Sequence, residues 1–329
     1  MRETLYLSSV EGLERENNNL IIFKNWQKHR VPINVIESIV IASEITITSK
    51  LLSLLNQLEI SIHFLGYYWN YIGSFYGKEK NTNGYILLKQ AEFFVRGETQ
   101  ITLIKKLLDA SFYNIIQNLT RSQVKNQEGI EEIRRYRRLL RKSDLKPEEF
   151  LGLEGNVRKI YYSYWEEILK EKYEFKRRTK QPPDNIVNVL ISFLNTLCYN
   201  LVNDRIMLSG LSPFISFYHS SFYKRYSLTL DISEIFKPLL VDRMIFSLLN
   251  YGTLNKKDFE IEKETWLVRL PEATTKLLFE KWNEKKKQTI FVKKLGKDYS
   301  WEWMISLELY KIQRFLIEGE DFEFYKIHT

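Results

Sequence analysis

Apolar and polar residues follow two different patterns along the chain, and the pattern changes near residue 80. Before that point, short stretches rich in β-branched and aromatic residues are separated by turn signals such as Asn17-Asn18-Asn19 and the Val31-Pro32 step, which is typical of strands. Residues 49–58 instead place leucines at i, i+3 and i+4 spacing and predict one helix. The stretches that predict strands are residues 4–8, 20–24, 35–42, 45–48, 60–65 and 71–75.

The predicted fold class is α+β. We expect residues 1–77 to form a small β-rich domain, similar to a β-sandwich with one helix, and we predict a linker at the polar residues 78–85. Residues 86–329 have a helical period and predict a mostly α-helical domain, with one strand-like piece at residues 290–292. The clearest predicted helices are residues 101–119, 157–169, 186–202 and 239–249.

The amino-acid composition gives the chain a net positive charge. The 329 residues include 49 Lys and Arg against 41 Asp and Glu, which gives a net charge of +8. The charge favours an anionic partner, with nucleic acid first, although many basic proteins bind no polyanion. An apolar content of 44% is enough for a packed core and excludes a disordered chain.

The single cysteine, Cys198, lies in an apolar helical run and has no partner for an internal disulfide. A buried thiol in a reducing compartment is the simpler interpretation, and a reactive nucleophile is the alternative. The first residues, MRETLYLSS, lack the apolar core of a signal peptide, and we expect no membrane span because charged residues interrupt the apolar runs. These features predict a cytoplasmic protein.

The first candidate for chemistry is Glu154, which falls on the apolar stripe of a predicted helix together with Val157 and Tyr161. A buried carboxylate needs a partner, because burying its charge alone is costly. Arg158, one turn later, or the N-terminus of the helix would be a structural partner. A metal ion is the functional alternative.

His219 is the second candidate, and it lies among aromatic residues. Ser212-Pro213 has the form of an N-cap followed by a first helical residue, so residues 214–220 are predicted to form a short helix that holds His219 near its end. A histidine beside aromatic residues is often a hydrogen-bonded packing residue. A metal ligand is the alternative.

Asp231 and Glu234 are the third candidate, at a spacing that puts both carboxylates on one helical face. Two neighbouring carboxylates repel, which raises a pKa unless a cation neutralises them. A solvated acidic face is the simpler reading, but apolar residues surround both positions. Pro238 is predicted to kink or restart the helix just beyond them.

Together, Glu154, His219 and Glu234 offer two carboxylates and one imidazole. That donor set suits Mn²⁺ or Mg²⁺ better than a structural zinc, which usually recruits cysteines. Such an ion could polarise a phosphodiester and activate water or a 3′-hydroxyl for in-line attack. The three residues are far apart in the sequence, so only the fold could bring them together.

The stretch GLSPFISFYHSSFYKRYSLTLDISEIFKPLLVD, from Gly210 to Asp242, resembles the signature of the CRISPR-associated adaptation integrase, the endonuclease shared by most CRISPR systems. That signature combines G-L-D/S-P, a following histidine, S-L-x-x-D-L-x-E/D-x-F-R-P and a later V-D. Upstream, residues 153–162 match its E-G-x-x-x-x-x-Y segment, and residues 177–197 resemble its R-x-x-x-P-P-x-D-x-x-N segment. Lys237 replaces the usual arginine of F-R-P, and Ser212 replaces a common aspartate.

The resemblance extends over essentially the whole chain. It implies that Glu154, His219 and Glu234 hold Mg²⁺ or Mn²⁺ and that Asp231 is a further catalytic acid. It also implies a homodimer that joins a small ferredoxin-like partner, with the β-rich domain serving dimerisation and partner docking. Such a complex inserts short double-stranded foreign DNA fragments at the leader end of the CRISPR array by 3′-hydroxyl attack.

Basic residues in three clusters, at residues 134–142, 176–180 and 285–294, suit the phosphates of DNA. For each cluster a solvated helix face is an equally good interpretation, and in the first cluster Glu131 and Glu132 could balance the charge. The residues predicted to bind DNA are Arg134, Arg138, Arg177, Arg178, Lys224, Arg225 and Lys237.

Two other functions fit the same residues. The site could serve a metal-dependent nuclease of branched DNA or RNA, which would hydrolyse without integrating. A non-catalytic basic DNA-binding scaffold would instead use the buried acids as structural ion pairs.

Overall fold

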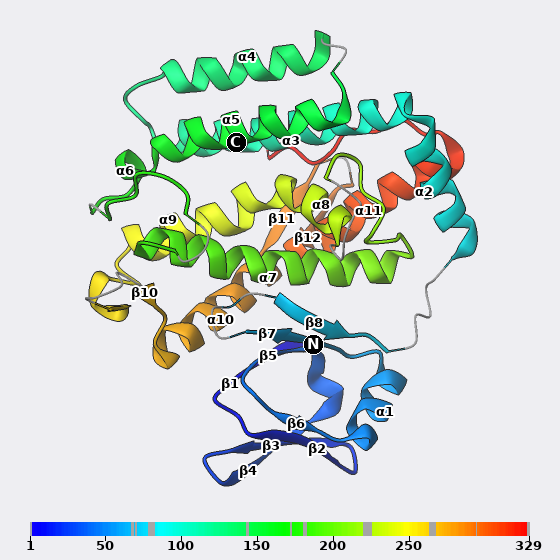
Figure 1. The fold of residues 1–329 in the computed structure, drawn as a ribbon, viewed down its shortest axis with the longest axis vertical. Helices are drawn as coiled ribbons and strands as arrows, with labels where there is room; N and C mark the ends of the chain where they lie inside the picture. Colours follow the sequence, from blue (N-terminus) through cyan, green and yellow to red (C-terminus); the bar gives the residue numbers. More distant parts are fainter. Residues whose placement is uncertain are drawn as a thin grey trace. The chain divides into compact units, whose positions relative to one another are not determined.

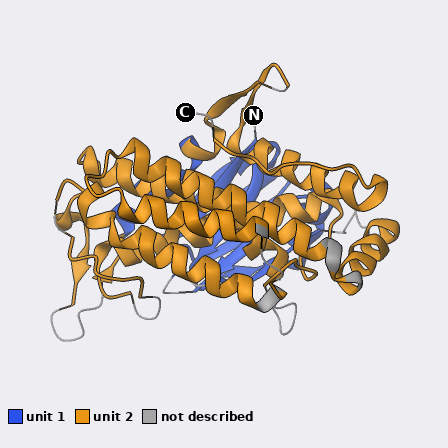
Figure 2. Ribbon diagram, turned by 90° about the horizontal axis from the view of Figure 1, so that it is seen from above, with its two compact units in different colours: residues 1–80, 272–284 blue, residues 81–271, 285–329 orange. Residues whose placement is uncertain are grey.

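The computed structural model describes residues 2–66, 69, 71–77, 83–142, 145–171, 173–179, 183–219, 226–262, 268–293 and 295–327. It divides the chain into two compact units (Figure 2). Unit 1 comprises residues 1–80 and 272–284, and unit 2 comprises residues 81–271 and 285–329. Most strands belong to unit 1 and most helices to unit 2 (Figure 1), so the predicted α+β class is confirmed.

Unit 1 contains two four-stranded sheets and one connecting helix. The first sheet has the order β1-β5-β7-β8, with parallel pairs β1–β5 and β5–β7 and an antiparallel edge. The second has the order β4-β3-β2-β6. The first-sheet strands are β1 (Glu3–Ser8), β5 (Ile36–Ala42), β7 (Ser61–Leu65) and β8 (Tyr71–Phe75), and the second-sheet strands are β2 (Gly12–Glu16), β3 (Asn19–Lys24), β4 (Gln27–Pro32) and β6 (Thr46–Ile47).

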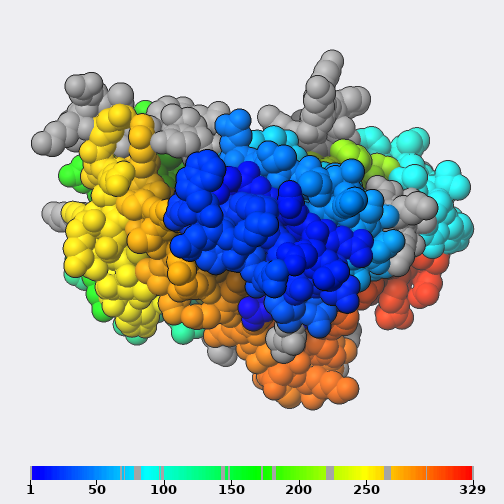
Figure 3. All heavy atoms as spheres, turned by 90° about the horizontal axis from the view of Figure 1, so that it is seen from below, coloured from blue at the N-terminus to red at the C-terminus, as the bar shows by residue number. Residues whose placement is uncertain are grey.

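One apolar core holds these sheets together. Helix α1 (Ser49–Leu58) supplies the parallel crossover from β5 to β7, and the Thr48 side chain accepts the Leu51 N–H to cap its first turn. The leucine face of α1 packs with inward residues of both sheets, as its sequence spacing predicted. Strand β4, by contrast, is largely exposed, on the dark-blue surface that Figure 3 presents.

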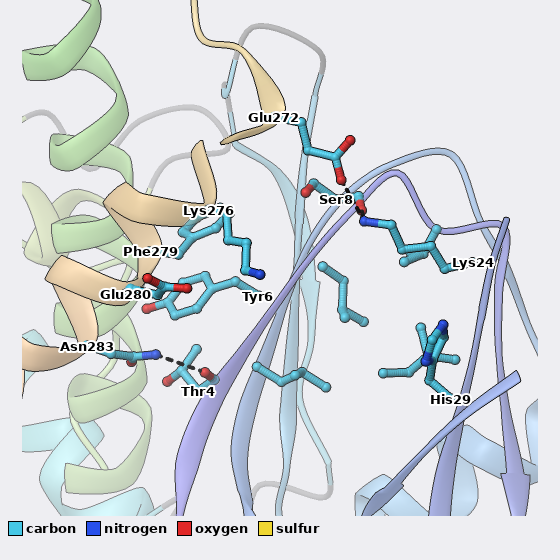
Figure 4. A pocket seen from close by; sticks show the side chains of 14 residues that line it. Thr4, Tyr6, Ser8, Lys24, His29, Glu272, Lys276, Phe279, Glu280 and Asn283 are labelled. Carbon is cyan, nitrogen blue, oxygen red and sulfur yellow. Dashed lines mark hydrogen bonds and ion pairs between the residues drawn. The ribbon is translucent and has the colours of Figure 1, made fainter. Parts of the chain in front are cut away.

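Helix α10 (Glu272–Lys287) was predicted within the helical domain, yet its residues 272–284 group with unit 1. The Phe279 ring stacks on Tyr6 of β1 at a centroid distance of 4.2 Å, and Asn283 Nδ2 donates to the Thr4 carbonyl at 3.2 Å. Both contacts border a pocket of about 400 Å³ between β1 and α10 (Figure 4). Lys24 Nζ bonds Glu272 at 2.6 Å at its rim.

Unit 2 is built from packed helices. Helix α8 lies between α3 and α7, and α4 covers α3 from the other side (Figure 1). The hairpin β11–β12 confirms the strand-like piece that residues 290–292 predicted. The elements are α2 (Gly84–Arg96), α3 (Glu98–Arg121), α4 (Glu128–Lys142), α5 (Pro147–Ser163), α6 (Trp165–Ile168), α7 (Ile186–Ser209), α8 (Ser227–Lys237), α9 (Arg243–Asn250), β9 (Glu260–Ile261), β10 (Val268–Arg269), β11 (Thr289–Val292), β12 (Lys297–Ser300) and α11 (Trp301–Glu318).

Helix α7 is the central apolar helix of unit 2. Within the described residues it is the one helix long and apolar enough to cross a membrane by length and composition, which we did not expect from the sequence. The protein itself buries 78% of that apolar window. Its position among α8, α9 and α11 therefore accounts for its composition as a core helix.

Candidate active site

Glu234 is buried on α8, and the end of that helix is unusual. Pro238 follows its last residue and begins a short π-helix, Pro238–Asp242, before α9. A proline has no N–H, so the α-helical hydrogen bond from residue 238 to the Glu234 carbonyl cannot form. The restart of the helix at Pro238 is as predicted, and it leaves a buried carbonyl in need of another donor.

Three polar residues on one face of α3 supply donors at this junction. Ser111 Oγ donates to the Glu234 carbonyl at 2.8 Å, and Asn114 Nδ2 donates to the Ile235 carbonyl at 3.2 Å. Asn118 Nδ2 donates to the Pro238 carbonyl at 2.7 Å. The sequence did not predict this set. Its only signal was polar residues at helical spacing on the apolar face of α3.

The Glu234 carboxylate lies between two cations. Arg158 Nη2 of α5 donates to Oε2 at 2.7 Å, and Lys237 bonds Oε1 from one turn further along α8. Burial alone would raise the pKa of Glu234, but Lys237 and Arg158 outweigh burial and lower it to about 2. Glu234 is therefore an anion at neutral pH. The same pairing raises the pKa of Lys237 and keeps its amine charged.

Arg158 is shared by three carboxylates. Besides Glu234, its Nε lies 3.5 Å from Glu154 Oε1 and its Nη1 lies 3.6 Å from Asp242 Oδ2. Neither of these two nitrogens makes a formed hydrogen bond. Two buried carboxylates and the half-buried Glu154 thus meet two cations, Arg158 and Lys237, which leaves the cluster short of positive charge.

The shortage of positive charge is visible in the pKa values of the acids. Burial, and then the charge of Glu234, raise the pKa of Glu154. Burial raises the pKa of Asp242 to about 6, against the attraction of Arg158. The structural pairing of Glu154 with Arg158, considered from the sequence, is present in the fold. It does not neutralise the group of acids fully.

His219 is held by Asp231 in the loop before α8. Its Nδ1 lies 2.6 Å from Asp231 Oδ1, and its main-chain N–H donates to the same oxygen at 3.2 Å. The N–H groups of Phe217 and Tyr218 donate to the other carboxylate oxygen. Residues 214–219 form turns and bends, so the predicted short helix was wrong. These N–H groups bond the Asp231 side chain instead of an earlier carbonyl.

Asp231 therefore orients His219, and both its oxygens are taken by N–H donors. Burial would lower the pKa of His219, but the hydrogen bond and charge of Asp231 raise it. Nε2 makes no hydrogen bond within the described part of the chain. A carboxylate on one ring nitrogen with the other nitrogen open is the arrangement of many metal-binding histidines.

The predicted ligands share one electrostatic neighbourhood: the charges of Glu234 and Glu154 both act on His219. Over the described ranges, however, no three His, Cys, Asp or Glu side chains lie close enough to hold one ion. Lys237 and Arg158 occupy the Glu234 oxygens instead. The metal site stays a prediction.

The residues predicted to bind DNA fall into different environments. Arg178 is turned inward, with Nη1 donating to Asn188 Oδ1 at 3.1 Å and Nη2 to Ser192 Oγ at 2.8 Å. Lys237 is committed to Glu234. Arg177 is exposed, whereas Lys224 and Arg225 lie outside the described residues.

On helix α4, Arg134 and Arg138 are exposed, and Arg134 pairs with Glu131, as the alternative of a solvated face predicted. Their neighbour Arg137 points inward. Its Nε and Nη2 donate to the two carboxylate oxygens of Asp109 at 3.1 and 3.0 Å. The basic run therefore divides between a structural ion pair and an open surface.

Comparisons with known proteins agree with this architecture. The family model described as CRISPR associated protein Cas1 matches residues 5–284. A Fusobacterium nucleatum protein named CRISPR-associated endonuclease Cas1 is 34% identical over 334 residues, which cover 99% of this chain and 97% of that protein. The structure of a Cas1 protein from Thermotoga maritima superposes with a TM-score of 0.87 at 29% identity, covering 99% and 100% of the two chains.

A casposase bound to integration product has the same fold, with a TM-score of 0.84 at 19% identity over 100% of this chain and 96% of that one. The family match spans most of the sequence, and the Fusobacterium relative aligns over nearly its full length. The chain belongs to the Cas1 family of CRISPR-associated proteins.

Proposed function

We propose that this protein is a metal-dependent DNA endonuclease and integrase of CRISPR adaptation, which inserts short foreign DNA fragments into the CRISPR array. The observation that carries the proposal is the buried neighbourhood of Glu154, Glu234 and His219, with Asp231 orienting the imidazole. Curated relatives of similar length are named endonucleases. Attack of a fragment's 3′-hydroxyl on a phosphodiester is the chemistry expected of such a site.

The residues fit Mg²⁺ or Mn²⁺ in donor type and in charge. Glu154 and Glu234 supply hard oxygens, and His219 has its Nε2 open while Asp231 holds Nδ1. A divalent cation would relieve the repulsion between the two glutamates that raises the pKa of Glu154. Binding would require Lys237 or Arg158 to release an oxygen of Glu234. When bound, the ion would stabilise charge on the phosphoryl group.

The chain's own residues have separable tasks in this proposal. Asp231 fixes the tautomer and direction of His219, so that Nε2 faces away from the loop that holds it. Arg158 acts with Lys237 to keep Glu234 ionised although it is buried, and both cations oppose the rise in the pKa of Glu154 that burial and Glu234 cause. Lys237, displaced from Glu234, would be available to a DNA phosphate as a point charge.

The resemblance to the family extends the proposal to partners. A homodimer joined to a small ferredoxin-like protein would place two such sites along one DNA fragment, with unit 1 in dimerisation and partner docking. The expected location is the cytoplasm. Size-exclusion chromatography with light scattering, with and without the small partner, would test the assembly.

The function is tested with labelled duplex DNA and a CRISPR leader–repeat target in Mn²⁺ or Mg²⁺. Glu154→Gln, His219→Ala and Glu234→Gln should each abolish strand transfer and cleavage. Glu132→Gln, at an exposed position of α4, is a matched control that should keep full activity.

The outcomes separate the candidates. Metal-dependent cleavage of branched DNA or RNA without strand transfer would favour a nuclease. The ion pairs of Arg158 with Glu154 and Glu234 are the observation that favours a scaffold, because a protein that binds no metal could use them for stability alone. DNA binding with no metal-dependent product, and loss of stability alone in Glu154→Gln, would establish the scaffold and reject the enzyme.

A further inference from the structure

We propose that Arg121, Arg243 and Lys285 together bind a phosphate group of DNA, with residues outside the predicted metal ligands Glu154, His219 and Glu234. The inference rests on the proposed function, since it names where that substrate's backbone is held. All three residues belong to unit 2. None of the basic residues predicted from the sequence to bind DNA is among them, although Lys285 opens one of the three basic clusters.

The three cations converge through contacts of neighbouring elements. Arg243, the first residue of α9, donates from Nε to Asn118 Oδ1 on α3 at 2.7 Å. Arg121 follows Asn118 by three residues, so the two side chains share one face at the end of α3. Arg243 is therefore held against the last turn of α3, beside Arg121.

Lys285 reaches the same place from α10. Its Nζ donates to Gln288 Oε1 at 3.0 Å and lies 5.8 Å from the centroid of the Trp301 ring. Trp301 packs edge-on against Tyr325 at 6.0 Å, and the charge of Arg243 in turn acts on Tyr325. The rings of Trp301 and Tyr325 thus lie on one side of the cluster.

None of the three side chains is in an ion pair within the described parts of the chain. The charge of the neighbouring Asp242 acts on Arg243, but Asp242 Oδ2 lies 3.6 Å from Arg158 Nη1, so this carboxylate is shared with another cation. Burial, and then the charges of Arg243 and Arg121, lower the pKa of Lys285 to about 8. Burial and Arg121 likewise lower the pKa of Arg243. Cations that are held this close together repel one another, and a bound anion would offset that repulsion.

Several neighbouring basic residues of unit 2 are instead paired with acids. Lys286, next to Lys285, is buried and lies 3.5 Å from Glu302. Lys326 pairs with Asp109 at 2.7 Å, and Lys106 pairs with Asp321 at 2.5 Å. Two guanidinium groups and one amine suit a phosphate, because guanidinium groups bind its oxygens in pairs and the amine adds a point charge.

The DNA arm of the test measures binding of a labelled duplex by fluorescence anisotropy in EDTA, over a series of salt concentrations. Removing a phosphate contact should reduce the slope of log K against log salt by about 0.9. We expect this reduction, with weaker binding, for Arg121→Gln and for Lys285→Gln. Lys281→Gln is the matched control, because Lys281 is on the same helix but already paired with Glu284 at 2.8 Å.

The phosphate arm uses inorganic phosphate and needs no DNA. Acetylation of Lys285 at about pH 8, followed by mass spectrometry, should be slowed by phosphate in the wild-type protein and not in Arg121→Gln, because the low pKa makes this amine reactive. Lys281 should show no protection. Circular dichroism would show that each variant is folded.

The outcomes are distinct. Unchanged salt slopes in both variants, while the wild type binds DNA, would overturn the inference. Phosphate protection with unchanged DNA binding would overturn the assignment to DNA and leave a free-anion site. Because neither arm involves metal or strand transfer, an inactive wild-type protein that shows both effects would reject the proposed enzyme and support the phosphate site.

Discussion

Ser111 Oγ and the Glu234 carbonyl are joined by a hydrogen bond of 2.8 Å that substitutes for the one Pro238 cannot make. The side chain of Glu234 faces the acid cluster, while its main chain depends on a different helix, α3. The position of a predicted metal ligand is thus set partly by a serine that contacts neither Glu154 nor His219 in any described interaction.

Ser111→Ala should lower the free energy of unfolding by about 2 kcal/mol, because a buried carbonyl loses its donor. Pro238→Ala restores a main-chain N–H that can reach the Glu234 carbonyl. In that background the loss caused by Ser111→Ala should shrink by about 1 kcal/mol. Urea unfolding of the four proteins in this double-mutant cycle measures the coupling.

Equal losses in both backgrounds would contradict this relationship. Ser163→Ala provides the control, since Ser163 is exposed and its hydroxyl bonds only the Ile160 carbonyl of its own helix, at 2.7 Å. Its unfolding should match that of the wild type.

Arg158→Gln should destabilise the protein by about 3 kcal/mol, because Glu234, Glu154 and Asp242 lose the guanidinium they share. Mn²⁺ should raise the melting temperature of this variant more than that of the wild type, since a bound cation would replace the missing charge. Calorimetry with and without Mn²⁺ measures both effects. A variant that Mn²⁺ does not stabilise would count against a metal at these acids. Arg314→Gln, at an exposed ion pair, should melt as the wild type does.

Asp231→Asn should weaken Mn²⁺ binding and slow strand transfer, each by about 10- to 100-fold, as expected when the residue behind a metal-bound histidine is lost. An amide has one acceptor oxygen, whereas Asp231 accepts N–H groups on both of its oxygens. Isothermal titration with Mn²⁺ gives a readout independent of activity. Asp298→Asn, at an exposed position on β12, is the control. Wild-type affinity in Asp231→Asn would remove the positioning role.

Asp109 should make the free energy of unfolding depend on pH. Burial alone would raise its pKa, but the hydrogen bonds and charges of Arg137 and Lys326 outweigh burial and lower it. A carboxyl with a lowered folded pKa contributes stability that is fully present above the unfolded value of about 3.9, and that is lost as the pH falls through the folded pKa.

Asp109→Asn should therefore cost about 2 kcal/mol at neutral pH, and the difference from the wild type should shrink steadily below about pH 4. Urea unfolding across that range tests the sign. A constant difference at all pH values would show that the loss comes from packing and not from the carboxylate charge.

Local spacing was enough to predict several parts of this molecule. Most strands of unit 1, the leucine face of α1 and the break at Pro238 depend on residues close together in the chain, so their periodicity carries the information. Strands β2 and β4 were missed, because their many charged and polar residues hide the strand pattern. The matched signature likewise selected Glu154, His219 and Glu234 before any geometry was known.

Long-range contacts decided the rest. Residues 214–219 have a helical start signal, yet the Asp231 carboxylate, brought from α8, takes their N–H groups and prevents the helix. Arg178 has the composition of a DNA-binding residue, but Asn188 and Ser192 of α7 turn it inward. No local pattern encodes which distant side chain will satisfy a buried group.

The sequence by itself determined the two kinds of architecture, the helical break and the identity of the acids and histidine. Only the tertiary structure decided that one guanidinium serves three carboxylates, that α3 supports the Glu234 main chain, and that Arg121, Arg243 and Lys285 meet without an ion pair in the described part of the chain. The reason is physical. Periodicity arises from neighbours along the chain, whereas the charge balance of a buried site is set by whichever helices pack around it.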